Sequence, residues 1–284
     1  MLLKYYSAVA STIKWLLAAI LLIPVTAHAE LMLYPTRVVI EDRQRGGHVE
    51  MINRSQETQT FRIGLYNSRM TEAGEIVVAE TPEPGELFAK DMLVFTPRQV
   101  TLRPGQSQTV RISIRRPANL ATGEYRTHLR FSRMTDANGP TNLETAVKLP
   151  PGQVGILLQA MIGASIPVIV RQGTTQAEVT LDSPALISAK GGNPPIFYAR
   201  FHRKGTRSVY GDLKAFYTPP GRRPIEVGKM GGVSVYVPNA TRTIRMPLTL
   251  PPGTALKGGT LSLRYTERQE AGGALLTQTQ VQVP

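Results

Sequence analysis

Alternation of apolar and polar residues with a period of two runs through most of the chain after residue 30. No long window carries the i, i+3, i+4, i+7 apolar stripe that marks an amphipathic helix. Short runs rich in Val, Thr, Ile, Tyr and Arg are separated by Pro, Gly and Asn at short intervals. This pattern is typical of β-sandwiches and β-barrels, so the sequence predicts an all-β fold.

The alternation locates the expected strands. In the first half they cover 36–41, 48–53, 58–66, 75–79, 93–96, 100–102, 108–114 and 124–134. The polar stretch 135–152 is too long for a tight hairpin and predicts a loop. The longest strand-like run, 153–170, follows it. In the second half the expected strands cover 177–181, 196–202, 211–218, 233–237, 243–248, 260–266 and 275–283.

An internal similarity divides the chain into two related parts. The segments 109–131 and 243–265 align without a gap at a constant offset, and Thr, Arg, Pro, Ala, Leu and Arg recur at identical places. Convergent strand composition is the alternative to duplication of one sandwich. Because a charge and a glycine end the long strand at Arg171-Gln172-Gly173, we place the expected domains at 30–172 and 173–284.

The first 29 residues have the three parts of a secretory signal peptide. Lys4 and Lys14 make the start positive, an apolar run covers 15–25, and Ala27-His28-Ala29 forms an A-x-A cleavage site. The apolar run is shorter than the roughly 20 residues that span a bilayer. We therefore expect 1–29 to be a Sec-type signal peptide cleaved after Ala29, with an uncleaved anchor as the alternative.

Composition narrows the classes of function. The chain has no cysteine, which removes thiol catalysis and thiolate metal sites, and it requires an exported protein to be held by its cores alone. The formal net charge is +13, or +11 without Lys4 and Lys14, and the basic residues are scattered. We interpret this charge as solvated surface and expect no nucleic-acid partner.

The long run has apolar residues on both faces of the predicted strand. One parity of QVGILLQAMI, residues 153–162, is entirely apolar, and the other is mixed. A half-buried strand normally has one polar face. Two interpretations stay open: a central strand buried in its own sandwich, or an edge strand that offers apolar side chains and open backbone groups to a partner. Exposed edges are usually protected by charge, and 153–170 contains none.

Several segments resemble, in order and spacing, the PapD-like periplasmic pilus chaperones. They are LYPTRVVIEDRQRGGHVEMINRS, FTPRQVTLRPGQSQTVRI, GEYRTHLRF and the long run that ends IPVIVR. The resemblance covers residues 31–171, and the second half is similar only in size and strand pattern. It implies two immunoglobulin-like β-sandwich domains in tandem, located in the periplasm of a Gram-negative bacterium. It also implies pilus or fimbrial subunits and an outer-membrane usher as partners.

The resemblance implies a mechanism as well. A chaperone of this family lends its long strand to a subunit that lacks the last strand of its sandwich. By that analogy Val154, Ile156, Leu158 and Ile162 would fill the groove of the subunit. Each fully buried aliphatic side chain contributes roughly 1.5–3 kcal/mol. The same strand implies that the free chain can self-associate.

Polar residues of the family are matched in part. Arg37 matches the arginine that binds the C-terminal carboxylate of the subunit, with an exposed strand arginine as the alternative. Glu124 and Arg171 match an ion pair at the domain interface. The family lysine that also holds the carboxylate falls at Pro167, and the stretch 255–258 lacks the family's acid from the second domain. These departures indicate a divergent branch.

Catalytic and metal-binding motifs are missing from the sequence. His48, His128 and His202 are far apart, and no HExxH, G-x-S-x-G, P-loop or G-x-G-x-x-G motif occurs. We therefore expect neither an enzyme nor a metal or cofactor. Two alternatives stay open: a fimbrial subunit or surface adhesin made of tandem sandwiches, and a secreted carbohydrate-active enzyme. The latter would need exposed aromatics, yet the single tryptophan, Trp15, lies in the expected leader.

Overall fold

The computed structural model describes residues 30–134, 163–189 and 191–284. Within these ranges the chain is built from β-strands, with two short 3₁₀ turns, η1 (Lys90–Met92) and η3 (Gln269–Ala271). The prediction of an all-β fold is confirmed. Nothing in the described ranges forms a helix with the length and apolar character needed to cross a bilayer. The expected leader, the loop 135–152 and the run 153–162 lie outside the described residues.

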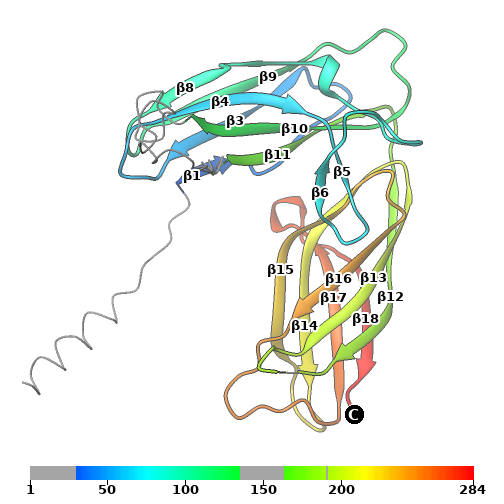
Figure 1. Ribbon diagram of the computed structural model, residues 1–284. Helices are drawn as coiled ribbons and strands as arrows, with labels where there is room; N and C mark the ends of the chain where they lie inside the picture. Colours follow the sequence, from blue (N-terminus) through cyan, green and yellow to red (C-terminus); the bar gives the residue numbers. More distant parts are fainter. Residues whose placement is uncertain (1–29, 135–162, 190) are drawn as a thin grey trace, which may run out of the picture.

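The first sandwich contains two sheets, with strand orders β1-β3-β9-β7 and β2-β11-β10-β4-β8. Its strands are β1 (Leu31–Tyr34), β2 (Val38–Ile40), β3 (Gly46–Asn53), β4 (Gln59–Tyr66), β7 (Leu93–Thr96), β8 (Gln99–Leu102), β9 (Ser107–Ile114), β10 (Gly123–Met134) and β11 (Gly163–Gln172). All pairs are antiparallel except β2 with β11. A separate hairpin, β5 (Ser68–Met70) and β6 (Ile76–Val78), hangs from one end of this sandwich (Figure 1).

The core of the first sandwich follows the period of two. Val49 and Met51 on β3 and Leu129 and Phe131 on β10 alternate with outward-facing neighbours and are almost fully buried. Tyr125, near the start of β10, donates its hydroxyl hydrogen bond to the carbonyl of Ala121 at 2.9 Å. This back-bonded tyrosine is the tyrosine corner of immunoglobulin-like sandwiches.

The second sandwich also has two sheets, with orders β12-β13-β16 and β15-β14-β17-β18. Its strands are β12 (Ala177–Ile187), β13 (Ile196–Gly205), β14 (Val209–Thr218), β15 (Ile225–Val235), β16 (Thr241–Pro247), β17 (Thr260–Glu267) and β18 (Leu275–Gln282). Phe197, Phe201, Leu213 and Tyr265 lie at its centre and are fully buried. The ring of Phe201 packs edge-on against Tyr265 with centroids 4.8 Å apart.

The segments that align in sequence occupy corresponding places in the two sandwiches. β9 lies in one sheet and is followed by β10 in the opposite sheet, and β16 and β17 are related in the same way. The duplication of one sandwich stays a prediction, but the shared strand–crossing–strand unit supports it.

The expected strands agree with the observed ones except at irregular places. The strands β1 and β5 were not predicted, because three or four residues carry too little alternation. β12 and β15 are longer than predicted because each contains a register shift that interrupts the period of two. The expected strand 36–41 is only β2, since the chain changes sheets between β1 and β2.

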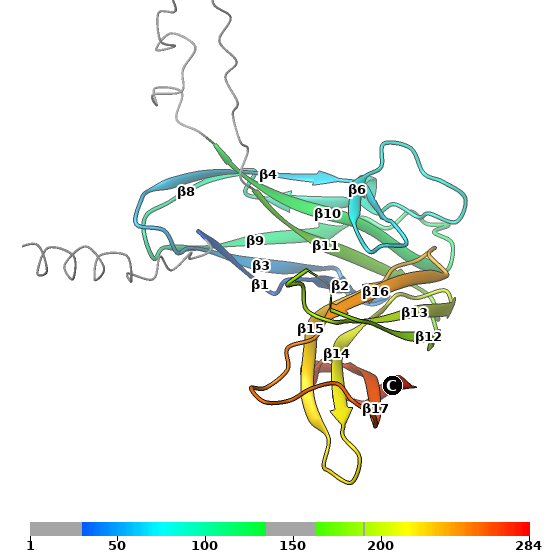
Figure 2. The same cartoon turned by 60° about the horizontal axis from the view of Figure 1, so that its bottom comes forward.

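The two sandwiches form an elbow, and the first lies across one end of the second (Figure 2). The tip of the β5–β6 hairpin reaches β16, where the amide of Thr243 donates to the carbonyl of Glu72 at 2.7 Å. The side chain of Asn239 donates to the carbonyl of Met70 at 2.8 Å. The hairpin is thus a bridge between the sandwiches, and it helps to fix the cleft between them.

Candidate functional site

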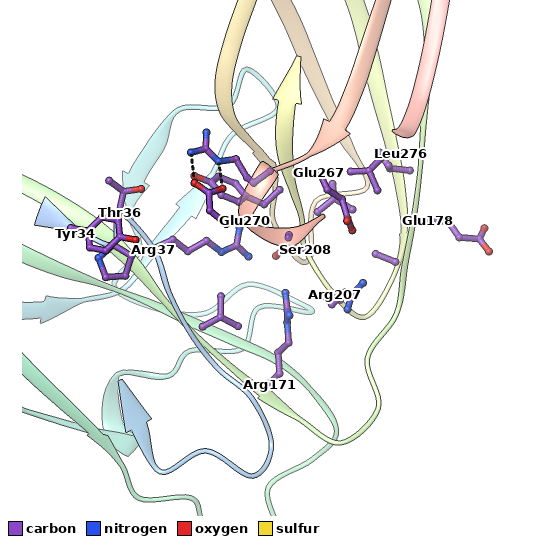
Figure 3. Close-up of a pocket in the computed structure, with 18 residues that line it drawn as sticks. Tyr34, Thr36, Arg37, Arg171, Glu178, Arg207, Ser208, Glu267, Glu270 and Leu276 are labelled. Carbon is purple, nitrogen blue, oxygen red and sulfur yellow. Dashed lines mark hydrogen bonds and ion pairs between the residues drawn. The ribbon is translucent and has the colours of Figure 1, made fainter. Parts of the chain in front are cut away.

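A cavity of about 920 Å³ lies at the inside of the elbow, between the two sandwiches. The first sandwich lines it with the segment that joins β1 to β2 and with the end of β11, and the second lines it with β12, β14, η3 and β18. Its charged lining residues are Arg37, Arg171, Arg207, Arg268, Glu178, Glu267 and Glu270. Figure 3 shows Arg37 and Arg171 extending from the first sandwich toward the second.

The position of Arg37 follows from the change of sheets at the start of the chain. β1 pairs with β3 in one sheet, and β2 pairs with β11 in the other. Arg37 is the last residue of the connection between them, directly before Val38. Because Val38 is the β2 partner of Val168, Arg37 lies level with Pro167 at the point where β2 stops covering β11.

The guanidinium of Arg37 is held by aromatic rings rather than by acids. Its Cζ lies 4.6 Å from the ring centroid of Tyr210 and 5.9 Å from that of Tyr236. Its Nη1 is buried and has no hydrogen-bond partner, and no ion pair among the described residues includes Arg37. Cation–π contacts orient a guanidinium but leave its N–H donors available. The charge of Arg37 therefore has no carboxylate partner among the described residues, and a carboxylate is the anion that suits its planar donor fork best.

Two other arginines of the cleft are neutralised by nearby carboxylates. Arg171 contacts Glu41 at 2.7 Å and Glu124 at 3.1 Å. Arg268 contacts Asp212 at 3.0 Å and Glu270 at 3.4 Å. Of the arginines that line the cleft, Arg37 and Arg207 are thus the two without a carboxylate partner among the described residues.

Glu124 connects the two sandwiches. Its side chain is almost completely buried and accepts a hydrogen bond from Nε of Arg171 at 3.1 Å within the first sandwich. From the second sandwich it accepts hydrogen bonds from the amide of Ser208 at 3.1 Å and from the Ser208 hydroxyl. The ion pair expected at Glu124 and Arg171 is present. Ser208 thus supplies two neutral donors to this carboxylate from the second sandwich.

A polar row continues along β10 behind this pair. Arg126 is 6% exposed, stacks on Tyr236 at 4.0 Å and donates to the carbonyl of Ser68 at 3.2 Å, while its Nη1 has no partner. Burial lowers the pKa of Arg126, and the positive charge of Arg37 acts in the same direction, while Tyr236 and Glu124 oppose it. Tyr236 therefore lies close to two guanidinium groups of the first sandwich.

His128 follows Arg126 on the same face of β10. Its Nδ1 shares a hydrogen bond of 2.6 Å with the Ser68 hydroxyl, and its ring lies 5.6 Å from that of Tyr66. Burial, reinforced by the charge of Arg126, lowers the pKa of His128 to about 3. The imidazole is therefore neutral near pH 7.

β11 has an edge that is only partly covered. On one side it pairs with β10 over its whole length, from Gly163 to Gln172. On the other side it pairs with β2 only at 168–170. In the part of the chain that the structure describes, the stretch from Gly163 to Pro167 therefore has no neighbouring strand on this second side. β11 is therefore central at one end and an edge at the other, while the run 153–162, to which the two interpretations refer, lies outside the described residues.

Of the site residues named from the sequence, Val154, Ile156, Leu158 and Ile162 lie outside the described residues. Pro167 is the β10 partner of His128. The described ranges contain no group of three or more His, Asp or Glu that could hold a metal ion. Sequence reasoning missed Tyr210, Tyr236, Ser208 and Arg126. The alternation of Glu124, Arg126 and His128 on one face of a predicted strand was the available signal, but residues distant in the sequence bury this face.

No protein-family model matches the sequence, and neither does any curated protein. Eight solved structures that resemble the chain are described as chaperones or as complexes that contain one. One is the YadV chaperone, with 10% identity, 90% of this chain and 100% of that chain covered, and a TM-score of 0.44.

Two others are complexes. The CsuC–CsuE chaperone–tip adhesion subunit pre-assembly complex of Acinetobacter baumannii has 12% identity, coverage of 89% and 98%, and a TM-score of 0.43. The Salmonella enterica SafA pilin in complex with the SafB chaperone has 16% identity, coverage of 91% and 98%, and a TM-score of 0.42.

Proposed function

We propose that this protein is a periplasmic chaperone for pilus or fimbrial subunits, which it stabilises by donating a strand and delivers to an outer-membrane usher. It acts without a cofactor and without catalysis. The observation that carries the proposal is the juxtaposition of the open edge of β11, from Gly163 to Pro167, with the guanidinium of Arg37 at the end of that edge.

The charge of Arg37 gives the added strand a direction. A partner strand that runs parallel to β11, as β2 does, would finish level with Pro167 and bring its C-terminal carboxylate to Arg37. An antiparallel strand would bring a positive N-terminus there instead. A bidentate arginine–carboxylate contact is the stronger option, so the site favours the C-terminus of a subunit.

The parity of the long run supports the same mode of binding. The residues of β11 that face the core of its sandwich are Ile166, Val168 and Val170, which are nearly fully buried. The proposed groove-filling residues, Val154, Ile156, Leu158 and Ile162, have the same parity. A strand of unbroken alternation would direct them to one side, where they could complete the core of another sandwich.

The experiment is capture of clients in the periplasm. A tagged full-length chain would be expressed in its own bacterium, and the proteins that co-purify would be identified by mass spectrometry. We expect a β-rich subunit, and we expect Ile156→Asp/Leu158→Asp to abolish its capture. The matched control is Gln153→Asp/Gln159→Asp, which places the same charges on the other parity and should retain capture. Equal capture by both double variants would refute strand donation.

Arg37 has its own test in the same assay. Arg37→Ala should lose most of the captured subunit, and Arg37→Lys should retain part of it, because a lysine keeps the charge without the fork. Intact mass of the periplasmic chain tests export, since cleavage after Ala29 leaves Glu30 as the first residue. A fimbrial subunit or adhesin, the alternative from the sequence, would instead be recovered within a surface polymer.

A further inference from the structure

The β5–β6 hairpin carries an exposed apolar strand away from the cleft residues. Ile76, Val77 and Val78 form β6 and are 41%, 40% and 59% exposed. Three consecutive β-branched residues without a charge are an unprotected sheet edge, of the kind that proteins normally blunt. β6 has β5 on one side, and no other strand pairs with it in the described part of the chain.

The backbone of β6 has free hydrogen-bonding groups on its outer side. The amide of Thr71 donates to Glu75 at 2.9 Å, and the amide of Ala79 donates to Asn67 at 3.0 Å. In an antiparallel pair, hydrogen-bonded positions alternate, so Val77 is the bonded partner of Arg69 between these two. The N–H and C=O groups of Ile76 and Val78 consequently point away from β5, where a further strand can bond to them.

This edge is held in place rather than left loose. Arg69 on β5 donates to both carboxylate oxygens of Glu86, at 2.9 and 2.7 Å, and to the carbonyl of Thr81 at 2.9 Å. At the other end the hairpin is fixed to β16 through Glu72. A strand that binds here therefore meets a preformed edge and does not have to order it first.

The charges around β6 determine which kind of strand can pair with it. Glu75 and Glu80 flank the strand, are exposed and belong to no ion pair among the described residues. In a two-fold antiparallel pairing of β6 with a second copy about Val77, Glu75 would face Ala79 of the other copy, and Glu80 of that copy would lie at the same end but on the opposite face of the ribbon. Each end of such a pair would hold two carboxylates at short range, and this repulsion disfavours self-pairing.

We infer that β6 is a docking edge for an extended segment of a partner protein, with alternating apolar residues between basic residues at its two ends. Main-chain hydrogen bonds to Ile76 and Val78 would supply the pairing. Glu75 and Glu80 would select the basic ends and reject a second copy of the chain. This site is separate from the cleft, so it does not depend on the proposed capture of subunits.

The test uses the mature chain and two labelled peptides with blocked ends, Lys-Val-Thr-Val-Thr-Val-Lys and its counterpart with Glu at both ends. Fluorescence anisotropy should show saturable binding of the first, and roughly tenfold weaker binding of the second, since two exposed charge contacts are lost and reversed. Hydrogen exchange should show that the first peptide protects the amides of Ile76 and Val78.

Variants identify the edge. Ile76→Lys/Val78→Lys should lose binding, and Val94→Lys should retain it, because Val94 is 41% exposed on the edge strand β7. Protection of the Val77 amide, which is bonded to Arg69, checks that the hairpin of the double variant still forms. Equal affinity for the two peptides, equal loss in the Val94 variant, or a dimer that Val78→Lys abolishes would each overturn the inference.

Discussion

The two faces of β10 are both buried, but different partners bury them. On one face, which we call the core face, Leu129 and Phe131 are completely enclosed by the core of the first sandwich. On the other face, which we call the cleft face, Glu124, Arg126 and His128 are 3%, 6% and 3% exposed, and residues outside that core cover them. The first face is stabilised by apolar area and packing, and the second by directed polar contacts.

The difference separates two kinds of stability. Burial of the core face depends on residues of the same sandwich, so its loss should unfold that sandwich alone. Burial of the cleft face depends on Ser208 and Tyr236 of the second sandwich, so its loss should first loosen the contact between the two. Substitutions on each face can test this division.

The largest effect is expected on the core face. Phe131→Ala removes a fully buried ring and should lower the free energy of unfolding of the first sandwich by about 4 kcal/mol. Phe201→Ala is the matched change in the second sandwich. Urea denaturation combined with local hydrogen exchange would show which sandwich opens. Equal loss of protection in both sandwiches for either variant would mean that they unfold as one unit.

On the cleft face, Glu124→Ala leaves Nε of Arg171 and both donors of Ser208 without their acceptor. Removing one member of a buried ion pair costs about 3–5 kcal/mol. We expect about 3 kcal/mol, because Arg171 keeps Glu41 at 2.7 Å.

In the same urea and exchange measurement, protection should fall first around Ser208 and the end of β11. A loss under 1 kcal/mol would mean that Glu124 contributes little to the contact between the sandwiches.

The core face could be predicted from the sequence and the cleft face could not. The period of two gave β7 at 93–96 as observed, because its alternating residues report burial within one sheet. The same rule treats Glu124, Arg126 and His128 as a solvated face. The second sandwich buries Glu124 and Arg126, and Ser68 and Tyr66 contact His128, so this burial is a long-range effect that no local pattern encodes.

The site residues that could be predicted from the sequence were predicted from the family resemblance, and not from a chemical motif. Arg37 and the pair of Glu124 with Arg171 were named in this way. Tyr210 and Tyr236 were missed because an aromatic residue in a strand normally predicts core. Ser208 was missed because a serine at a strand end is too common to signal a partner for a buried carboxylate.

A smaller effect should appear as a pH dependence of the cleft face. The folded pKa of His128 is about 3, below the ordinary value of 6.5, so the unfolded chain binds the extra proton between these values. Stability from this group is therefore complete above pH 6.5 and is lost as the pH falls toward 3. Between pH 7 and pH 5 the loss should be about 2 kcal/mol.

Other groups also titrate between pH 7 and pH 5, so a variant without His128 is needed to show whether this histidine causes the loss of stability. His128→Gln keeps a polar side chain at the position but does not titrate, and its stability should fall less than that of the natural protein between pH 7 and pH 5. Parallel pH profiles for the two proteins, measured by urea denaturation, would assign the acid sensitivity elsewhere.

The smallest effect separates electrostatic stacking from simple apolar contact on the cleft face. Tyr236 has its ring 4.0 Å from the guanidinium carbon of Arg126 and 5.9 Å from that of Arg37, and its hydroxyl makes no hydrogen bond among the described residues. Tyr236→Phe keeps the ring, so its stability should match that of the natural protein. Tyr236→Leu keeps apolar volume but has no π-face, and it should lose about 1 kcal/mol.

The two variants differ mainly in whether a ring faces the guanidiniums, since leucine keeps most of the apolar volume. If the leucine and phenylalanine variants have equal stability in urea, the apolar contact of Tyr236 with Met70 and Ile169 is what holds this part of the elbow. If only the leucine variant is destabilised, Arg126 and Arg37 hold the second sandwich in place through their contacts with the ring of Tyr236. In that case the cleft face is ordered by charge as well as by burial, which the core face of the same strand never is.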